Sequence, residues 1–207
     1  MNLFDHEWAR VGGGIGKLVR YCDDFVILCR SRGGAEEARR RVSTILGRLG
    51  LQLNPDKTSI ACLTRGAQGF DFLGFHHHKV ESWKWRGRWY LQRWPSVRAM
   101  RSIRAKVRRA TDRRFVGEVI EMAVGNLNRM LRGWHAYFRY GNSARKFTAI
   151  DSYVHERLAI LASRKHKLPG RNWGPNSRFN RQWFLSLRVF QLSASGAIRY
   201  GTVHARR

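Results

Sequence analysis

The sequence predicts an α+β fold in which an antiparallel sheet is followed by a bundle of basic α-helices. Residues 1–95 alternate short apolar runs with turn-forming residues, as antiparallel strands do. Residues 96–167 instead repeat apolar residues at helical spacing, and Gly, Asn, Ser and Pro interrupt residues 168–207. We therefore expect three regions, divided near residues 95 and 168.

The chain is strongly basic, which bears on its partners. Forty Lys and Arg against 14 Asp and Glu give a net charge of +26, of which +12 falls in residues 96–167. Side chains of like charge repel one another, and a polyanionic partner would relieve this repulsion, so nucleic acid is the expected partner. No apolar stretch approaches the roughly 20 residues of a membrane-spanning helix, and no signal-peptide pattern opens the chain. Three cysteines without paired spacing predict free thiols and a cytoplasmic location.

In the first region, turn signals separate short apolar segments. Gly12–Gly14 and Gly16 break the chain before the first of them, and Gly50 is expected to end the one helix, which carries an apolar face from Ala35 to Leu49. The expected elements are a strand at 17–21, a strand at 25–30, a helix at 34–49, a turn at 54–58, a strand at 59–63, an alternating segment at 69–75 and a hairpin at 82–94 turning at Gly87.

The second region predicts three helices that bury one apolar face each. The second helix is expected at about 117–139, Gly141 is expected to cap it, and Asn142 or Ser143 begins the third. The inward residues are Met100, Ile103 and Val107, then Ile120, Leu127, Leu131, Trp134 and Phe138, and then Phe147, Ile150, Val154, Leu158 and Leu161.

Two adjacent carboxylates, Asp23 and Asp24, lie at the turn between the first two strands. Carboxylates on a turn held by two apolar strands form a rigid anionic point that Mg²⁺ can neutralise, as in nucleotidyl-transfer sites. Asp is also a common turn residue, so the dipeptide alone leaves a purely structural role open.

The surrounding residues resemble a known family. "LVRYCDDFVILCRS" resembles the Tyr-x-Asp-Asp hairpin of reverse transcriptases, in the form found in group II intron-encoded enzymes. "LGLQLNPDKTSI" and "GFDFLGFHHH" resemble the next two blocks of that family. "LRGWHAYFRYGNSARKFTAIDSYVHERLAILASRKHK" resembles its maturase-specific domain X. The resemblance covers residues 1 to about 167, and it implies the C-terminal part of a polymerase palm followed by a thumb and maturase domain.

The resemblance also implies an activity and site residues. It implies an RNA-directed DNA polymerase and intron maturase that binds intron RNA, an RNA template, a DNA primer and dNTPs. Asp23 and Asp24 would be the metal ligands and Tyr21 would lie beside the primer end, while Cys22 replaces the more usual Ala. Lys57 would neutralise phosphate or donate a proton at the leaving pyrophosphate, although a solvated turn lysine is the alternative.

The resemblance further places a primer grip at Phe72, Leu73, Gly74 and Phe75. There a glycine would let the backbone approach the primer phosphates closely, and a simple strand bulge is the alternative for Gly74.

Residues 1–16 resemble the stretch just before this hairpin, expected as a helix leading away from the site, so Asp5 and Glu7 are not counted as metal ligands. The second palm carboxylate and the fingers would then come from a separate N-terminal reverse transcriptase fragment. Two Mg²⁺ ions would bind only when that carboxylate is supplied. The isolated chain is expected not to extend a primer, and a polymerase-inactive RNA-binding remnant that assists splicing is the alternative function.

The basic residues of the helical region are candidates for RNA binding, although a charge run is often only a solvated face. The candidates are Arg98, Arg101, Arg108, Arg109, Arg132, Arg139, Arg145, Lys146, Arg164 and Lys165. Tyr137 and Tyr140 are candidate exposed rings. His76–His78 lack metal-site spacing, so no zinc site is expected there. The last region is expected either to contact nucleic acid or to pack on the bundle.

Overall fold

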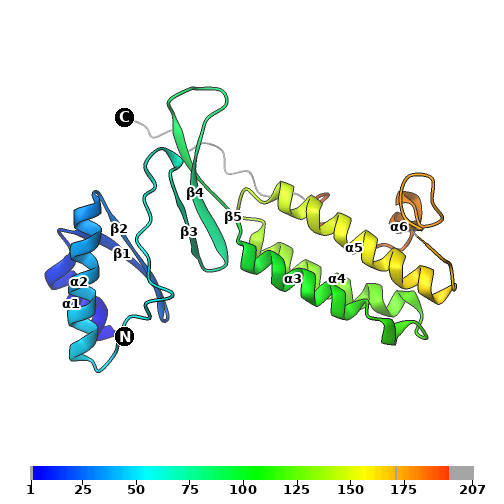
Figure 1. The fold of residues 1–207 in the computed structure, drawn as a ribbon, viewed down its shortest axis with the longest axis horizontal. Helices are drawn as coiled ribbons and strands as arrows, with labels where there is room; N and C mark the ends of the chain where they lie inside the picture. The colour runs from blue at the N-terminus through cyan, green and yellow to red at the C-terminus, as the bar shows by residue number, and fades with distance from the viewer. Residues whose placement is uncertain (1, 171, 196–207) are drawn as a thin grey trace. The chain divides into compact units, whose positions relative to one another are not determined.

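The computed structural model describes residues 2–170 and 172–195, which form two compact units (Figure 1). The first unit contains the described residues up to Leu73 together with His77–Leu91. The second contains Gly74–His76 and the described residues from Gln92 onwards. Small antiparallel sheets come first and helices follow, which confirms the predicted α+β class.

The first unit begins with two helices packed on a β-hairpin. Helix α1 spans Asn2–Gly12, strands β1 and β2 span Gly16–Tyr21 and Asp24–Cys29, and helix α2 spans Arg32–Arg48. The strands pair antiparallel from Gly16 opposite Cys29 to Tyr21 opposite Asp24. Their helix-facing side chains pack on a core of buried residues from the two helices, which are Phe4, Trp8, Ala38, Val42, Ile45 and Leu46.

The N-terminus of α2 is fixed by Ser31, whose hydroxyl accepts a hydrogen bond from the Gly34 N–H at 3.1 Å. The predicted strand at 59–63 is wrong, because that segment is irregular and leads into the short helix η1, Thr64–Gly66. Its backbone bonds within its own loop instead of a sheet. The Cys62 N–H donates to the Gln68 side chain at 2.7 Å, and the Gln68 N–H donates to the Cys62 carbonyl at 2.9 Å.

A second sheet has three strands in the order β3-β4-β5, spanning Gly69–Phe72, Phe75–Glu81 and Trp89–Pro95. Leu73 and Gly74 have φ values of 49° and 75°, and they form the two-residue turn between β3 and β4. Positive φ at both central residues is the pattern of a type I′ hairpin turn. The bulge considered for Gly74 is therefore wrong, because the alternating segment folds back on itself as a hairpin.

The second unit is built on three helices. They are α3, Val97–Ala110, α4, Ile120–Phe138, and α5, Ala144–Lys165, and α3 packs against both of the others. The short helix η2, Arg113–Phe115, connects α3 to α4. All the residues predicted to face inward on α3 and α5 are buried. On α4, Ile120 and Trp134 are only partly buried, whereas Leu127, Leu131 and Phe138 are buried as predicted.

Residues 172–195 pack on this bundle. They contain α6, Arg181–Ser186, and they add Phe184, Val189 and Leu192 to the buried core. The Asp151 carboxylate on α5 accepts the N–H groups of Leu192 and Ser193, each at 2.9 Å. Of the two roles left open for this region, packing on the bundle is therefore confirmed for these residues. Residues 171 and 196–207 lie outside the described part of the chain.

None of the helices in the described ranges is both long and apolar enough to cross a bilayer.

Candidate functional site

The two adjacent carboxylates lie at the tip of the β1–β2 hairpin. Tyr21 and Asp24 form the last pair of the ladder, so Cys22 and Asp23 are the two central turn residues. Cys22 has a φ of 54°, whereas Asp23 is not among the residues with positive φ. Positive φ at the first central residue alone is the pattern of a type II′ turn, which favours glycine at that position. The side chain at Cys22 thus sits on a strained backbone, a feature often found at functional sites.

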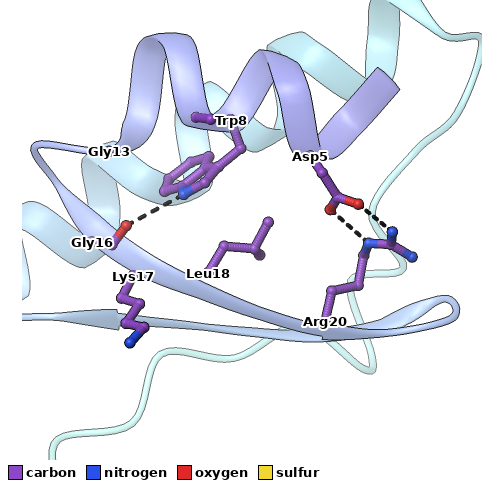
Figure 2. Close-up of a pocket in the computed structure, with 8 residues that line it drawn as sticks. Asp5, Trp8, Gly13, Gly16, Lys17, Leu18 and Arg20 are labelled. Carbon is purple, nitrogen blue, oxygen red and sulfur yellow. Dashed lines mark hydrogen bonds and ion pairs between the residues drawn. The ribbon is translucent and has the colours of Figure 1, made fainter. Parts of the chain in front are cut away.

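An arginine ties this turn to helix α1, and Figure 2 shows its contact with Asp5 on that helix. The Arg20 Nε donates to Asp5 Oδ1 at 2.7 Å, and Nη2 donates to the other oxygen of the same carboxylate. The third guanidinium nitrogen, Nη1, donates to the Cys22 carbonyl oxygen at 2.7 Å. These bonds to Arg20 hold the pKa of Asp5 below its ordinary value and raise the pKa of Arg20. One guanidinium therefore fixes both the helix and the turn backbone.

Sequence reasoning missed this role of Asp5, because it treated the first helix as leading away from the site. The two residues lie 15 positions apart, and the bond depends on how α1 packs against β1. A signal was present in the sequence: an acidic residue on the first helix and a basic residue on the helix-facing side of the following strand.

A cleft of about 660 Å³ runs between α1 and β1, and Figure 2 shows the side chains that line it. Asp5 and Arg20 close one end, and at the other the Trp8 indole N–H donates to the Gly16 carbonyl at 3.3 Å. The lining does not include Asp23 or Asp24. We therefore assign the cleft to the packing of α1 on β1 and not to the site of the turn carboxylates.

Both turn carboxylates are exposed, and neither forms an ion pair with any other described residue. Among residues 2–170 and 172–195, no group of three or more His, Cys, Asp or Glu side chains is arranged to hold a metal ion. Mg²⁺ in proteins commonly takes one or two carboxylates and fills its other positions with water and phosphate oxygens. Asp23 and Asp24 fit that donor set as two of its ligands.

Tyr21 is 63% exposed beside these carboxylates. Lys57 is also exposed, in a turn where the Asn54 side chain accepts the N–H groups of Asp56 and Lys57 at 3.0 and 3.3 Å. Among the described residues, no hydrogen bond or ion pair joins Lys57 to Asp23 or Asp24. The catalytic role of Lys57 therefore stays a prediction.

The predicted primer-grip residues have different environments. Phe75 is buried in the core of the second unit, where its ring lies 4.8 Å from the Phe138 ring. Phe72 is partly buried, and Leu73 and Gly74 form the hairpin turn. The Gly74 carbonyl accepts the N–H of Ser96 at 2.9 Å, so this backbone is held against the start of α3.

The three consecutive histidines lie on β4. His77 stacks on Phe70 at 5.0 Å, and His76 lies 5.4 Å from Trp94. These ring contacts account for two of the three side chains by packing.

The basic residues of α3, α4 and α5 leave much of their charge uncompensated. In the described part of the chain, none of the Arg and Lys side chains on these helices pairs with a carboxylate. Arg98, Arg101, Arg108 and Arg109 are all exposed on α3, opposite its buried face. These four arginines therefore form one cationic face of α3.

The remaining candidates fall into two groups. Some are held within the unit: Lys165 donates to the Glu118 carbonyl at 2.9 Å, the Arg132 guanidinium lies 4.9 Å from the Phe190 ring, and Arg139 lies 5.8 Å from the Tyr140 ring. Arg145 and Arg164 are exposed, and Lys146 is half-buried. Tyr137 and Tyr140 are 51% and 44% exposed, as expected for rings that can receive a base.

Comparison with known families matches both parts of the chain. Residues 2–77 match the reverse transcriptase (RNA-dependent DNA polymerase) family, and residues 100–179 match the group II intron maturase-specific domain. No curated protein matches the chain significantly. The fold and the two matches together define a reverse transcriptase region joined to a maturase region. The chain belongs to the group II intron reverse transcriptase/maturases.

Proposed function

We propose that this chain contributes Asp23 and Asp24 to an Mg²⁺-dependent site that transfers nucleotides to a primer on an RNA template. The observation that supports it is the hairpin tip. There, two exposed carboxylates, unpaired with any cation of residues 2–170 and 172–195, stand on a turn that Arg20 fixes to α1. A metal site needs ligands that do not rearrange during the reaction, and this turn is held from both strands and from the helix.

The residues have distinct roles in this proposal. Asp23 and Asp24 would hold Mg²⁺, which on binding would activate the primer 3′ oxygen and stabilise the leaving pyrophosphate. Arg20 and Asp5 hold the turn carbonyl in place, and the exposed Tyr21 ring offers a surface for the nucleotide at the primer end. Lys57, exposed in the turn at residues 54–58, would neutralise phosphate.

We propose in addition that the chain binds intron RNA through the exposed arginines of α3 and through Arg145 and Arg164 on α5. The cationic side chains of α3 have no carboxylate partners in the described structure, so phosphates would be their counterions. This binding does not depend on the turn carboxylates. It therefore also supports the second candidate function, a maturase-like RNA-binding protein that assists splicing without polymerisation.

Two measurements separate these functions. Salt-dependent binding to intron RNA tests the basic helices, and incorporation of labelled dNTP on an RNA template tests the turn. Two-metal transfer needs carboxylates that converge on the metals, and the described residues hold no group of three or more metal-ligating side chains. The polymerase assay is therefore run with and without an added polypeptide that carries a reverse transcriptase palm and fingers. RNA binding with extension that depends on Asp23 supports the polymerase. RNA binding without extension supports the second function.

A further inference from the structure

The loop that joins β4 to β5, residues 82–88, exposes two tryptophan side chains. Trp83 is 94% exposed, and Trp85, two residues later, is 43% exposed. The hairpin predicted at 82–94 puts both tryptophans on its first strand, and this part of the prediction is wrong. β4 ends at Glu81 and β5 begins at Trp89, so both tryptophans lie in the connecting loop (Figure 1). Exposed apolar side chains that gather in one place, especially when polar residues surround them, commonly mark a binding surface.

This loop is ordered by its own hydrogen bonds. The Ser82 N–H donates to the Arg88 carbonyl at 2.8 Å, and the Ser82 hydroxyl accepts the N–H groups of Lys84 and Trp85 at 3.3 and 3.1 Å. Gly87 takes a φ of 81°, which glycine adopts without strain. The exposed rings are thus presented on a preformed turn, which lowers the entropic cost of binding a partner.

Positive charge surrounds the rings. Lys84, Arg86 and Arg88 are all exposed, and the Lys84 Nζ and the Arg88 guanidinium lie 5.0 and 5.5 Å from the centre of the Trp85 ring. The nearest acidic residue, Glu81, accepts the Gly87 N–H at 2.7 Å, so its carboxylate is engaged within the turn. The exposed surface of the loop therefore combines ring faces with three cations.

We propose that residues 82–88 bind a single-stranded segment of RNA, with a base stacked on Trp83 and the backbone phosphates near Lys84, Arg86 and Arg88. Proteins that hold single strands combine aromatic stacking platforms with basic side chains, and unpaired bases are the parts of RNA that aromatic side chains can reach. This inference rests on the proposed RNA binding, and it adds a second surface, separate in sequence from the basic helices.

Charge and size favour RNA over the other partners of such a loop. An acidic protein could pair with the three cations, but that pairing makes no use of the exposed face of the Trp83 ring. A membrane surface attracts Trp and Arg, but the strength of interfacial binding scales with the apolar area that is buried, and this seven-residue loop offers only two rings.

The test compares Trp83→Ala with the wild-type chain in binding an unstructured RNA and the same RNA annealed to its complement. Loss of one stacked base should weaken binding to the single strand about tenfold. The slope of affinity against salt should not change, because no charge is removed. Binding to the duplex should be unaffected, and Trp83→Phe should keep most of the affinity. Iodouridine-substituted RNA should cross-link to Trp83.

Matched controls make the outcome decisive. Leu91→Ala removes another exposed apolar side chain, 57% exposed on β5, and should leave RNA binding unchanged. Unchanged affinity of Trp83→Ala for the single strand would overturn the inference. Equal losses of affinity for the single strand and the duplex would also overturn it. Binding to vesicles of anionic lipid is measured as well, and a Trp83→Ala variant that loses only this binding would overturn the inference too.

The proposed function fails separately from this inference. If Trp83→Ala binds normally while substitutions on α3 weaken binding, only the loop assignment is wrong. If the wild-type chain does not bind RNA at all, the proposed RNA binding by the helices and the proposed RNA binding by residues 82–88 are both wrong.

Discussion

Arg20 on β1 forms a two-point ion pair with Asp5 on α1, and the same guanidinium donates to the Cys22 carbonyl at the hairpin tip. The helix before the hairpin thus supports the turn that carries Asp23 and Asp24. Disturbing the ion pair should affect the turn as well as the packing of the first unit.

The ion pair predicts a pH dependence of stability. Because Arg20 lowers the pKa of Asp5 from its ordinary value of 3.8, the stabilisation is fully present above that value and is lost as the pH falls through the lowered folded-state pKa. Asp5→Asn should therefore unfold at lower urea concentration than the wild type at pH 7, and the difference should narrow progressively as the pH falls below 3.8. Urea titrations at pH 7 and below pH 3.8 measure this difference.

Glu36→Gln provides the matched control for that experiment. It removes an ion pair between two highly exposed side chains, Arg32 and Glu36 on α2. Such pairs contribute little to the free energy of unfolding, so this variant should unfold at nearly the same urea concentration as the wild type. A difference for Asp5→Asn that persists unchanged in acid would show that the Arg20–Asp5 ion pair is not its source.

The strained backbone at Cys22 predicts opposite effects of two substitutions. Glycine adopts positive φ without penalty, so Cys22→Gly should raise the free energy of unfolding by up to about 1 kcal/mol. Cys22→Val places a β-branched side chain on the same backbone and should lower it by about 1 kcal/mol or more. Chemical denaturation of the two variants measures this ranking, and the reverse order would contradict the type II′ turn.

The core of the second unit predicts a graded loss of stability. The Trp134 ring lies 4.7 Å from Phe138 and 5.7 Å from Phe147, but it is only partly buried. Trp134→Ala should therefore cost about 2 to 4 kcal/mol, toward the lower end of the range for aromatic core residues. Met122→Ala, at a position 57% exposed on the same helix, should change stability by less than about 0.5 kcal/mol. Equal thermal shifts in the two variants would contradict this assignment of the core.

Two arginines of the second unit should separate RNA binding from stability. Arg108 is exposed on α3, so Arg108→Gln should reduce the slope of log affinity against log salt by about one without changing the melting temperature. Arg157 is half-buried and donates to the hydroxyl and carbonyl oxygens of Thr111, each at 3.2 Å. Arg157→Gln should lower the melting temperature and leave the slope unchanged. Salt titrations with melting curves of both variants measure this, and an unaltered slope for Arg108→Gln would remove that residue from the RNA surface.

The parts of the fold that could be predicted from the sequence are those set by local periodicity. The apolar faces of α2, α3 and α5 and the β1–β2 hairpin follow from residues a few positions apart. The strand expected at 59–63 is apolar enough, but a strand also needs a partner, and the Gln68 side chain takes the backbone bond of Cys62 instead.

The same limit applies to the candidate site. The sequence placed Asp23 and Asp24 on a turn, since the flanking strands are adjacent in the chain. The Arg20–Asp5 pair, the exposure of Trp83 and the packing of Leu192 on the bundle depend on tertiary contacts that no local pattern encodes.

The most direct test of the proposed polymerase site is templated incorporation of labelled dNTP. The chain is combined with a polypeptide that carries the upstream palm and fingers, and wild type is compared with Asp23→Asn. We expect Mg²⁺-dependent extension by the wild-type pair, none by the Asp23→Asn pair, and almost equal RNA binding by both, because the carboxylate would bind metal and not RNA. Equal extension by the two pairs would contradict a role for Asp23, and extension by the chain alone would contradict the need for a second segment.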